Sequence, residues 1–145
     1  MTQRQFEKGV GYWVLSTANL LERAANEELA PHGITFRQVQ VLGTLACVGE
    51  MSQTALADRI QVEPSTVVRI VDRMERDGWI ERFPSPTDRR VKLLRMTDKV
   101  EPVWQTIQEA GVRIRQRITE GLSEQQVSQL MNSLETMCAN LGGDA

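Results

Sequence analysis

The sequence predicts a mainly α-helical protein that carries one short β-hairpin. Apolar residues recur every three or four positions through most of the chain, which is the spacing of amphipathic helices. That period is lost only around residues 79–96, where two short strand-like runs flank a segment with two prolines. With 145 residues, of which 41% are hydrophobic and 25% are charged, the chain fits one domain over residues 1–145. We expect six helices in it.

Long amphipathic helices are predicted at both ends of the chain. The first covers residues 5–30 and ends at Pro31 and Gly33. Two more are expected over 98–120, capped by Thr97, and over 124–140, where Ser123 and Gln126 form a capping box. The stripe on the first helix is wide, and it comprises Phe6, Val10, Trp13, Val14, Thr17, Leu20, Leu21, Ala24 and Leu29. So wide an apolar face must be buried against something large, for which a second subunit is one candidate.

The middle of the chain predicts three shorter helices. Thr35 caps a helix over 36–47, and Ser52 caps another over 53–60. Pro64 suits the first position of the next helix, and Gly78 is placed to be the left-handed residue after its end. The last two of these helices are joined by three residues, Gln61 to Glu63, which is a helix-turn-helix pattern. Its second helix points Val67, Ile70, Val71 and Met74 inward and leaves Ser65, Thr66, Arg69, Arg73 and Arg76 outside.

The hairpin follows this pattern directly. Residues 79–83 and 91–96 are expected as its strands. Residues 84–88 are expected to be irregular, because their two prolines lack N–H donors and fix φ. A basic-tipped hairpin after a helix-turn-helix is a wing. The predicted fold class is therefore a winged helix-turn-helix over about 35–96, flanked by helical regions over about 1–33 and 98–145.

Charge and composition limit the classes of function that the chain can have. The formal net charge is −2, yet five basic residues and one acid lie between Arg82 and Arg95. Binding to DNA needs such a local basic face rather than a basic total. One histidine and two cysteines are too few side chains for a metal site or a disulfide framework, so no cofactor is expected. The sequence contains no nucleophile–base pair and no phosphate-binding glycine loop, so an enzyme is not expected.

Location is also predicted from composition. No apolar run is long enough to span a bilayer, so no membrane partner is expected. The first nine residues lack the apolar core of a signal peptide. We therefore expect a cytoplasmic protein.

Two groups of residues are candidates for contact with double-stranded DNA. On the second helix of the helix-turn-helix, Ser65 and Thr66 can bond phosphates or base edges, and Arg69 can fork onto guanine. At the wing tip, a planar guanidinium from Arg89 or Arg90 suits the narrow minor groove. Asp88 would repel phosphate, so its expected role is to orient a neighbouring arginine. Each group also has an alternative without DNA contact. Ser65 would then only cap its helix, Arg69 would be a solvated side chain, and the wing tip would be a charged, solvated loop.

These residues resemble a known family. The segment from Asp88 to Thr97 resembles the wing signature of MarR-type regulators, an Asp-x-Arg followed by apolar residues and a threonine. Residues 63–69 and 77–82 resemble that family's recognition helix and first wing strand. The resemblance covers nearly the whole chain, and the SlyA branch is closest, through Pro64-Ser65, Arg69 and Thr97-x-Lys99-x-Glu101-Pro102.

The resemblance implies a homodimer on a pseudo-palindromic operator. The first helix and the last two would form the dimerisation region, with a wing at each side of the site. Pro64, Ser65, Thr66 and Arg69 would face the major groove, and Arg73 is added as a further candidate contact. One of Arg89 and Arg90 would enter the minor groove, with Asp88 bracing the wing. Which arginine enters is left open.

The resemblance also implies release from DNA by small aromatic or phenolic anions. Trp13, Ser16, Leu20, His32 and Phe36 are the candidate residues of a pocket between the dimerisation and DNA-binding regions. Plain core packing for the aromatic residues, and a surface position for His32, is the alternative.

Two other functions compete. A winged helix can serve protein–protein contact without binding DNA, but five arginines on the helix and wing count against it. A redox-sensing regulator would need a reactive cysteine. Cys47 and Cys138 are expected instead to be buried small hydrophobes.

Overall fold

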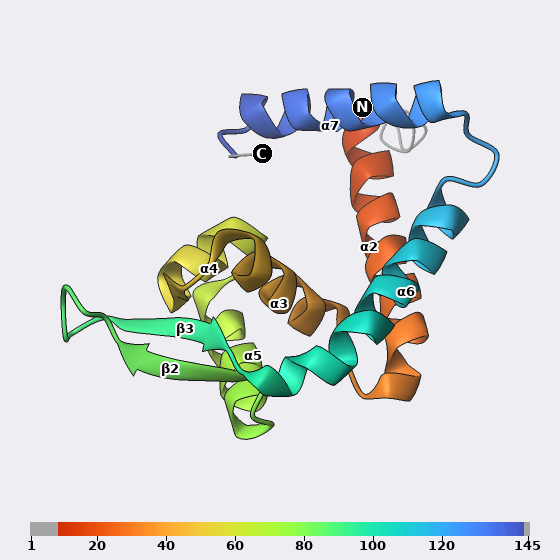
Figure 1. Cartoon of the computed structure of the whole chain (residues 1–145). Coiled ribbons are helices and arrows are strands. Elements are labelled where there is room, and N and C mark those ends of the chain that lie inside the picture. The colour runs from red at the N-terminus through yellow and green to blue at the C-terminus, as the bar shows by residue number, and fades with distance from the viewer. Residues whose placement is uncertain (1–8, 144–145) are drawn as a thin grey trace. The chain divides into compact units, whose positions relative to one another are not determined.

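The computed structural model describes residues 9–143, and its helices and strands are shown in Figure 1. The chain divides into two compact units at Ile114 and Arg115. The first begins with α2 (Val10–Leu29), a short 3₁₀ turn (Ala30–His32), α3 (Phe36–Val48), β1 (Met51–Ser52), α4 (Gln53–Ile60) and α5 (Pro64–Arg76). It continues through β2 (Ile80–Pro84), β3 (Lys92–Met96) and a 3₁₀ turn (Asp98–Val100) into α6 (Glu101–Ile118). The second unit contains the end of α6 and α7 (Glu124–Asn140).

The predicted fold class is confirmed. The described residues hold six α-helices and a small antiparallel sheet, and the helix bounds lie within a few residues of those expected. Phe6 and the predicted start of the first helix lie outside the described residues. No helix among residues 9–143 is long and apolar enough to cross a membrane.

Side-chain caps set the helix starts. Thr35 and Ser123 form capping boxes with Gln38 and Gln126, and Ser52 accepts a hydrogen bond from the N–H of Ala55. These bonds satisfy N–H groups that have no partner inside the helix. They confirm the three predicted caps.

The end of α5 turns the chain into the wing. Gly78 has φ +81°, and the N–H groups of Trp79 and Gly78 donate to the carbonyls of Met74 and Glu75 at 2.9 and 3.0 Å. This is a Schellman ending, and it confirms Gly78 as the left-handed residue after the helix, a position that favours a residue without Cβ. The turn leads within two residues to the first residue of β2.

The sheet has three strands in the order β1-β3-β2, whereas the sequence predicted only the hairpin. Met51 pairs with Leu94, so the start of α4 is tied to the returning wing strand. The expectation that residue 84 is irregular was wrong, because Pro84 ends β2 opposite Lys92. An edge strand tolerates this proline, since its outer side has no ladder bond to lose.

The core of the first unit lies under α5 and the sheet. Val67, Val71 and Met74 of α5 are fully buried and join a cluster with Leu42, Leu56, Ile80 and Leu94. Burying this stripe decides which face of α5 points outward.

Two further expectations were wrong. The Thr97 side chain makes no cap bond; its hydroxyl donates to the carbonyl of Gly78 and its N–H to that of Trp79. The chain then makes the 3₁₀ turn, so α6 begins at Glu101, three residues later than expected. Cys47 and Cys138 are free and exposed rather than buried. Cys47 is two residues beyond the buried Leu45, which puts it on the opposite side of α3.

Candidate nucleic-acid interface

The outward face of α5 is polar and carries arginine. Ser65 and Arg69 are exposed, and they lie one turn apart on the side away from the buried stripe. Pro64 occupies the first helical position, as predicted. Because the side chains at the N-terminal end are small, a ligand as wide as a DNA duplex can approach the helix backbone closely.

The three arginines of α5 differ in their pairing. Among the described residues, Arg69 has no ion-pair partner, so its guanidinium is available to an external anion. Arg73 and Arg76 share Asp77, with nitrogen–oxygen distances of 3.9 and 3.3 Å. Pairs this exposed contribute little stability and can be exchanged for phosphate contacts.

One flank of α5 borders a cleft of about 960 Å³. The opposite wall is the end of α2 and the start of α3, where the N–H of Phe36 donates to the Asn26 side chain at 2.9 Å. Arg37 is anchored there by hydrogen bonds of 3.0 and 2.9 Å to the two carboxylate oxygens of Glu22. The cleft is lined by Asn26, Ala30, Gly33, Ile34, Thr35, Arg37, Gln38, Thr66, Arg69, Ile70 and Arg73. Three guanidinium groups on its wall favour an anionic guest.

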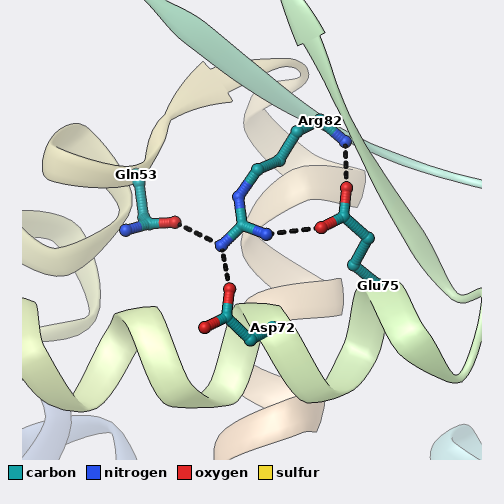
Figure 2. Close-up of polar contacts among 4 residues, drawn as sticks. All are labelled: Gln53, Asp72, Glu75 and Arg82. Atoms are coloured by element: carbon teal, nitrogen blue, oxygen red, sulfur yellow. Dashed lines mark hydrogen bonds and ion pairs between the residues drawn. The ribbon is translucent and has the colours of Figure 1, made fainter.

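The other flank of α5 meets the wing through Arg82. Figure 2 shows its guanidinium, from β2, between Gln53, Asp72 and Glu75. One terminal nitrogen donates to Glu75, and the other donates to Asp72 at 2.6 Å and to Gln53 at 2.9 Å. The backbone N–H of Arg82 also donates to Glu75, at 3.2 Å. One side chain therefore joins β2 to both helices of the helix-turn-helix.

The environment of Arg82 keeps it charged. Burial lowers the pKa of the guanidinium, but its hydrogen bonds to Asp72 and Glu75 and the charges of both carboxylates outweigh burial. The pKa therefore lies above its usual value. The sequence indicated Arg82 only as part of a basic stretch. Its role in joining β2 to the two helices could not be predicted, because its partners lie 7, 10 and 29 residues away along the chain.

At the wing tip, Asp88 holds Arg90. The carboxylate accepts hydrogen bonds from the Arg90 backbone N–H at 3.0 Å and from two of its guanidinium nitrogens at 3.2 Å. These bonds, the side-chain ones first, hold the pKa of the Asp88 carboxyl below its usual value. Arg89 is exposed and has no ion-pair partner among the described residues. The predicted orienting role of Asp88 thus has a direct geometric counterpart in its bonds to Arg90.

The wing loop itself is ordered by its own backbone. The Ser85 N–H donates to the Val91 carbonyl at 2.8 Å, and the Val91 N–H donates to the Asp88 carbonyl at 3.0 Å. Ser85 is buried, and its hydroxyl accepts from the N–H of Thr87. These bonds present the two arginines on a closed turn rather than on a free loop.

The five predicted pocket residues do not line this cleft. Trp13 and Leu20 are exposed on α2, and Ser16 is half-buried there. His32 is exposed in the 3₁₀ turn, while Phe36 is half-buried at the start of α3 and packs against the core. Within residues 9–143, no group of three His, Cys, Asp or Glu side chains could hold a metal ion.

Comparison with known proteins identifies the family. The MarR family model matches residues 34–92, from just before α3 to the first residue of β3. The "Multiple antibiotic resistance protein MarR" of Salmonella typhimurium is 33% identical over 110 residues, which is 75% of this chain and 76% of that protein.

Two solved structures of similar proteins contain a bound ligand. A mutant MarR from Escherichia coli in complex with operator DNA has a TM-score of 0.84 at 26% identity, over 94% of this chain and 99% of that one. CouR from Rhodococcus jostii RHA1, bound to p-coumaroyl-CoA, has a TM-score of 0.78 at 25% identity, over 90% and 92%. This chain belongs to the MarR family and is a DNA-binding transcription regulator, not an enzyme.

Proposed function

We propose that the protein is a homodimer that binds a pseudo-palindromic operator in double-stranded DNA. The N-terminal half of α5, with Pro64, Ser65, Thr66 and Arg69, enters the major groove. A wing arginine, Arg89 or Arg90, enters the minor groove next to it. A dimer of this kind reads two half-sites about one helical turn apart, ~10 base pairs.

The observation that carries the proposal is that α5 and the wing each present an exposed arginine that has no ion-pair partner among the described residues. These arginines are Arg69 on α5 and Arg89 on the wing, and Asp88 binds the guanidinium of Arg90, the residue after Arg89. In Figure 1, the wing formed by β2 and β3 extends from the end of α5. The similarity of this chain to a mutant MarR from Escherichia coli that was solved with operator DNA supports DNA as the partner.

Exposed apolar side chains support the homodimer. On α2, Trp13, Leu15 and Leu20 are 60, 68 and 65% exposed. No residue of α7 is buried, although Leu130, Met131 and Leu134 are apolar. Apolar faces of this extent on both terminal helices are typical of subunit interfaces. The dimerisation regions proposed from sequence, about 1–33 and 98–145, contain all these residues.

The cleft beside α5 supports release by a small aromatic or phenolic anion. A carboxylate seated there would meet guanidinium groups of Arg69 and Arg73, which belong to the DNA-facing helix. CouR with bound p-coumaroyl-CoA is a similar structure that holds a ligand with an aromatic group. The pocket proposed from the sequence, with Trp13, Ser16, Leu20, His32 and Phe36, remains a separate proposal.

The other functions and properties predicted from the sequence stay predictions. A protein-contact module is disfavoured by Arg69 of α5 and Arg89 of the wing, which have no ion-pair partner among the described residues. Redox sensing has only the exposure of Cys47 and Cys138 in its favour. The SlyA-like branch, repression and the cytoplasmic location remain predictions from the sequence.

Replacing both wing arginines tests DNA binding. We expect Arg89→Ala/Arg90→Ala to weaken binding to a duplex selected from a random pool by at least about tenfold, because each arginine contact contributes about 1–3 kcal/mol. The slope of log K against log salt should fall by about 1–2. Arg115→Ala/Arg117→Ala removes the same charge from α6 and should change neither value, provided that light scattering shows that this variant keeps the mass of the wild type. Equal losses in both pairs would mean that only net charge matters.

The dimer is tested by light scattering. We expect about twice the 16.4 kDa chain mass for the wild type and a shift toward the chain mass for Leu15→Glu/Leu20→Glu, which buries two carboxylates in the proposed interface. Val48→Glu places one carboxylate at an exposed apolar site on α3 and should leave the mass doubled. A wild-type protein that stays at the chain mass at micromolar concentration contradicts the proposal.

Ligand release is tested with 4-hydroxybenzoate, using benzyl alcohol as a neutral analogue. The anion should bind by calorimetry with a Kd that Arg73→Gln weakens about tenfold, as for loss of one charged hydrogen bond. It should also lower the affinity of the wild type for DNA. Equal binding of the neutral analogue, or binding of the anion with no effect on DNA affinity, rules the proposal out.

A further inference from the structure

We propose that Arg82 is a positioning residue for DNA binding, which raises affinity without touching DNA by pairing with two carboxylates on the recognition helix. Asp72 and Glu75 are those carboxylates. The inference rests on the proposed function, because it assumes that the outward face of α5 meets the phosphate backbone.

Asp72 lies on the face that would meet DNA. It follows Arg69 by three residues and Ser65 by seven, and these spacings place all three on one side of a helix. Its side chain is 59% exposed. An unpaired carboxylate at this position would repel the same phosphates that Arg69 attracts, since like charges brought together weaken binding.

Arg82 is placed to act on the carboxylates rather than on DNA. Its side chain is 22% exposed, and both terminal nitrogens already donate to Asp72, Glu75 and Gln53. Three of the five N–H groups of the guanidinium are thus used inside the protein. Glu75 is held at both oxygens, one by the guanidinium and the other by the Arg82 backbone N–H (Figure 2).

The pairing changes the charge and the direction of the acids. The three side chains together carry −1, whereas the two carboxylates without Arg82 would carry −2. The bonds also draw both carboxylates toward β2, because Arg82 binds both oxygens of Glu75 and one oxygen of Asp72. Charge-assisted bonds of this kind hold their geometry better than neutral ones.

The test measures affinity by fluorescence anisotropy on a duplex that the wild type selects from a random-sequence pool. Arg82→Gln should bind about tenfold more weakly, since it uncovers two like charges near phosphate. The triple variant Arg82→Gln/Asp72→Asn/Glu75→Gln should return to within about threefold of the wild type. Arg95→Gln is the matched control, because Arg95 is a wing-strand arginine whose partners, Glu81 and Glu50, lie off the recognition helix.

The outcomes separate this inference from the proposed function. A triple variant as weak as Arg82→Gln would mean that Arg82 contacts DNA or holds the wing, and it overturns the inference. Wild-type affinity in Arg82→Gln, or an equal loss in Arg95→Gln, also overturns it. Failure of the wild type to select any duplex would instead contradict the proposed function.

A second variant covers the case in which Arg82→Gln does not fold, as judged by its thermal melt. Asp72→Asn/Glu75→Gln keeps Arg82 and removes both negative charges. The inference predicts tighter binding than that of the wild type. Unchanged or weaker binding contradicts it.

Discussion

The burial of one stripe of α5 is the constraint on which the rest of the interface depends. Val67, Val71 and Met74 follow the spacing of one helix face, and all three are fully buried. Each such side chain contributes roughly 1.5–3 kcal/mol on burial. Rotating the helix to hide its arginines would expose all three. The core therefore fixes Ser65, Asp72 and the arginines on the outside, and the Schellman ending at Gly78 then directs the chain into the wing.

The chain reconciles a net charge of −2 with binding to a polyanion by pairing its acids locally. Asp88 forms an ion pair with Arg90, and Asp77 pairs with Arg73 and Arg76. The carboxylates beside the wing pair with Arg82. Arg69 and Arg89 keep no such partner among the described residues. The local field at the surface is then set by which charges are paired, rather than by the total.

The sequence predicted the elements well because the signals for them are local. Caps, the proline at the start of α5 and the glycine after it act within a few residues, and they located helix ends closely. β1 was missed because two residues are too short for any periodic signal. The role of Thr97 was mistaken because its hydroxyl is used by Gly78, 19 residues away.

The site was predicted less completely, for the same reason. The residues proposed for DNA contact follow from helix spacing and from the family resemblance. The cleft joins residues 26–38 to residues 66–73, and the Arg82 cluster joins β2 to α4 and α5. Contacts between segments so far apart depend on how the helices pack, which spacing along the chain does not encode. The exposure of the two cysteines was missed for the same reason, since burial of a small side chain depends on how the neighbouring helix packs.

Amide hydrogen exchange with and without a selected duplex tests most directly whether α5 and the wing meet DNA together. The account predicts slower exchange in residues 64–70 and in residues 85–91 in the same complex, at matched occupancy. Slower exchange confined to other segments, or in only one of these two, would contradict it.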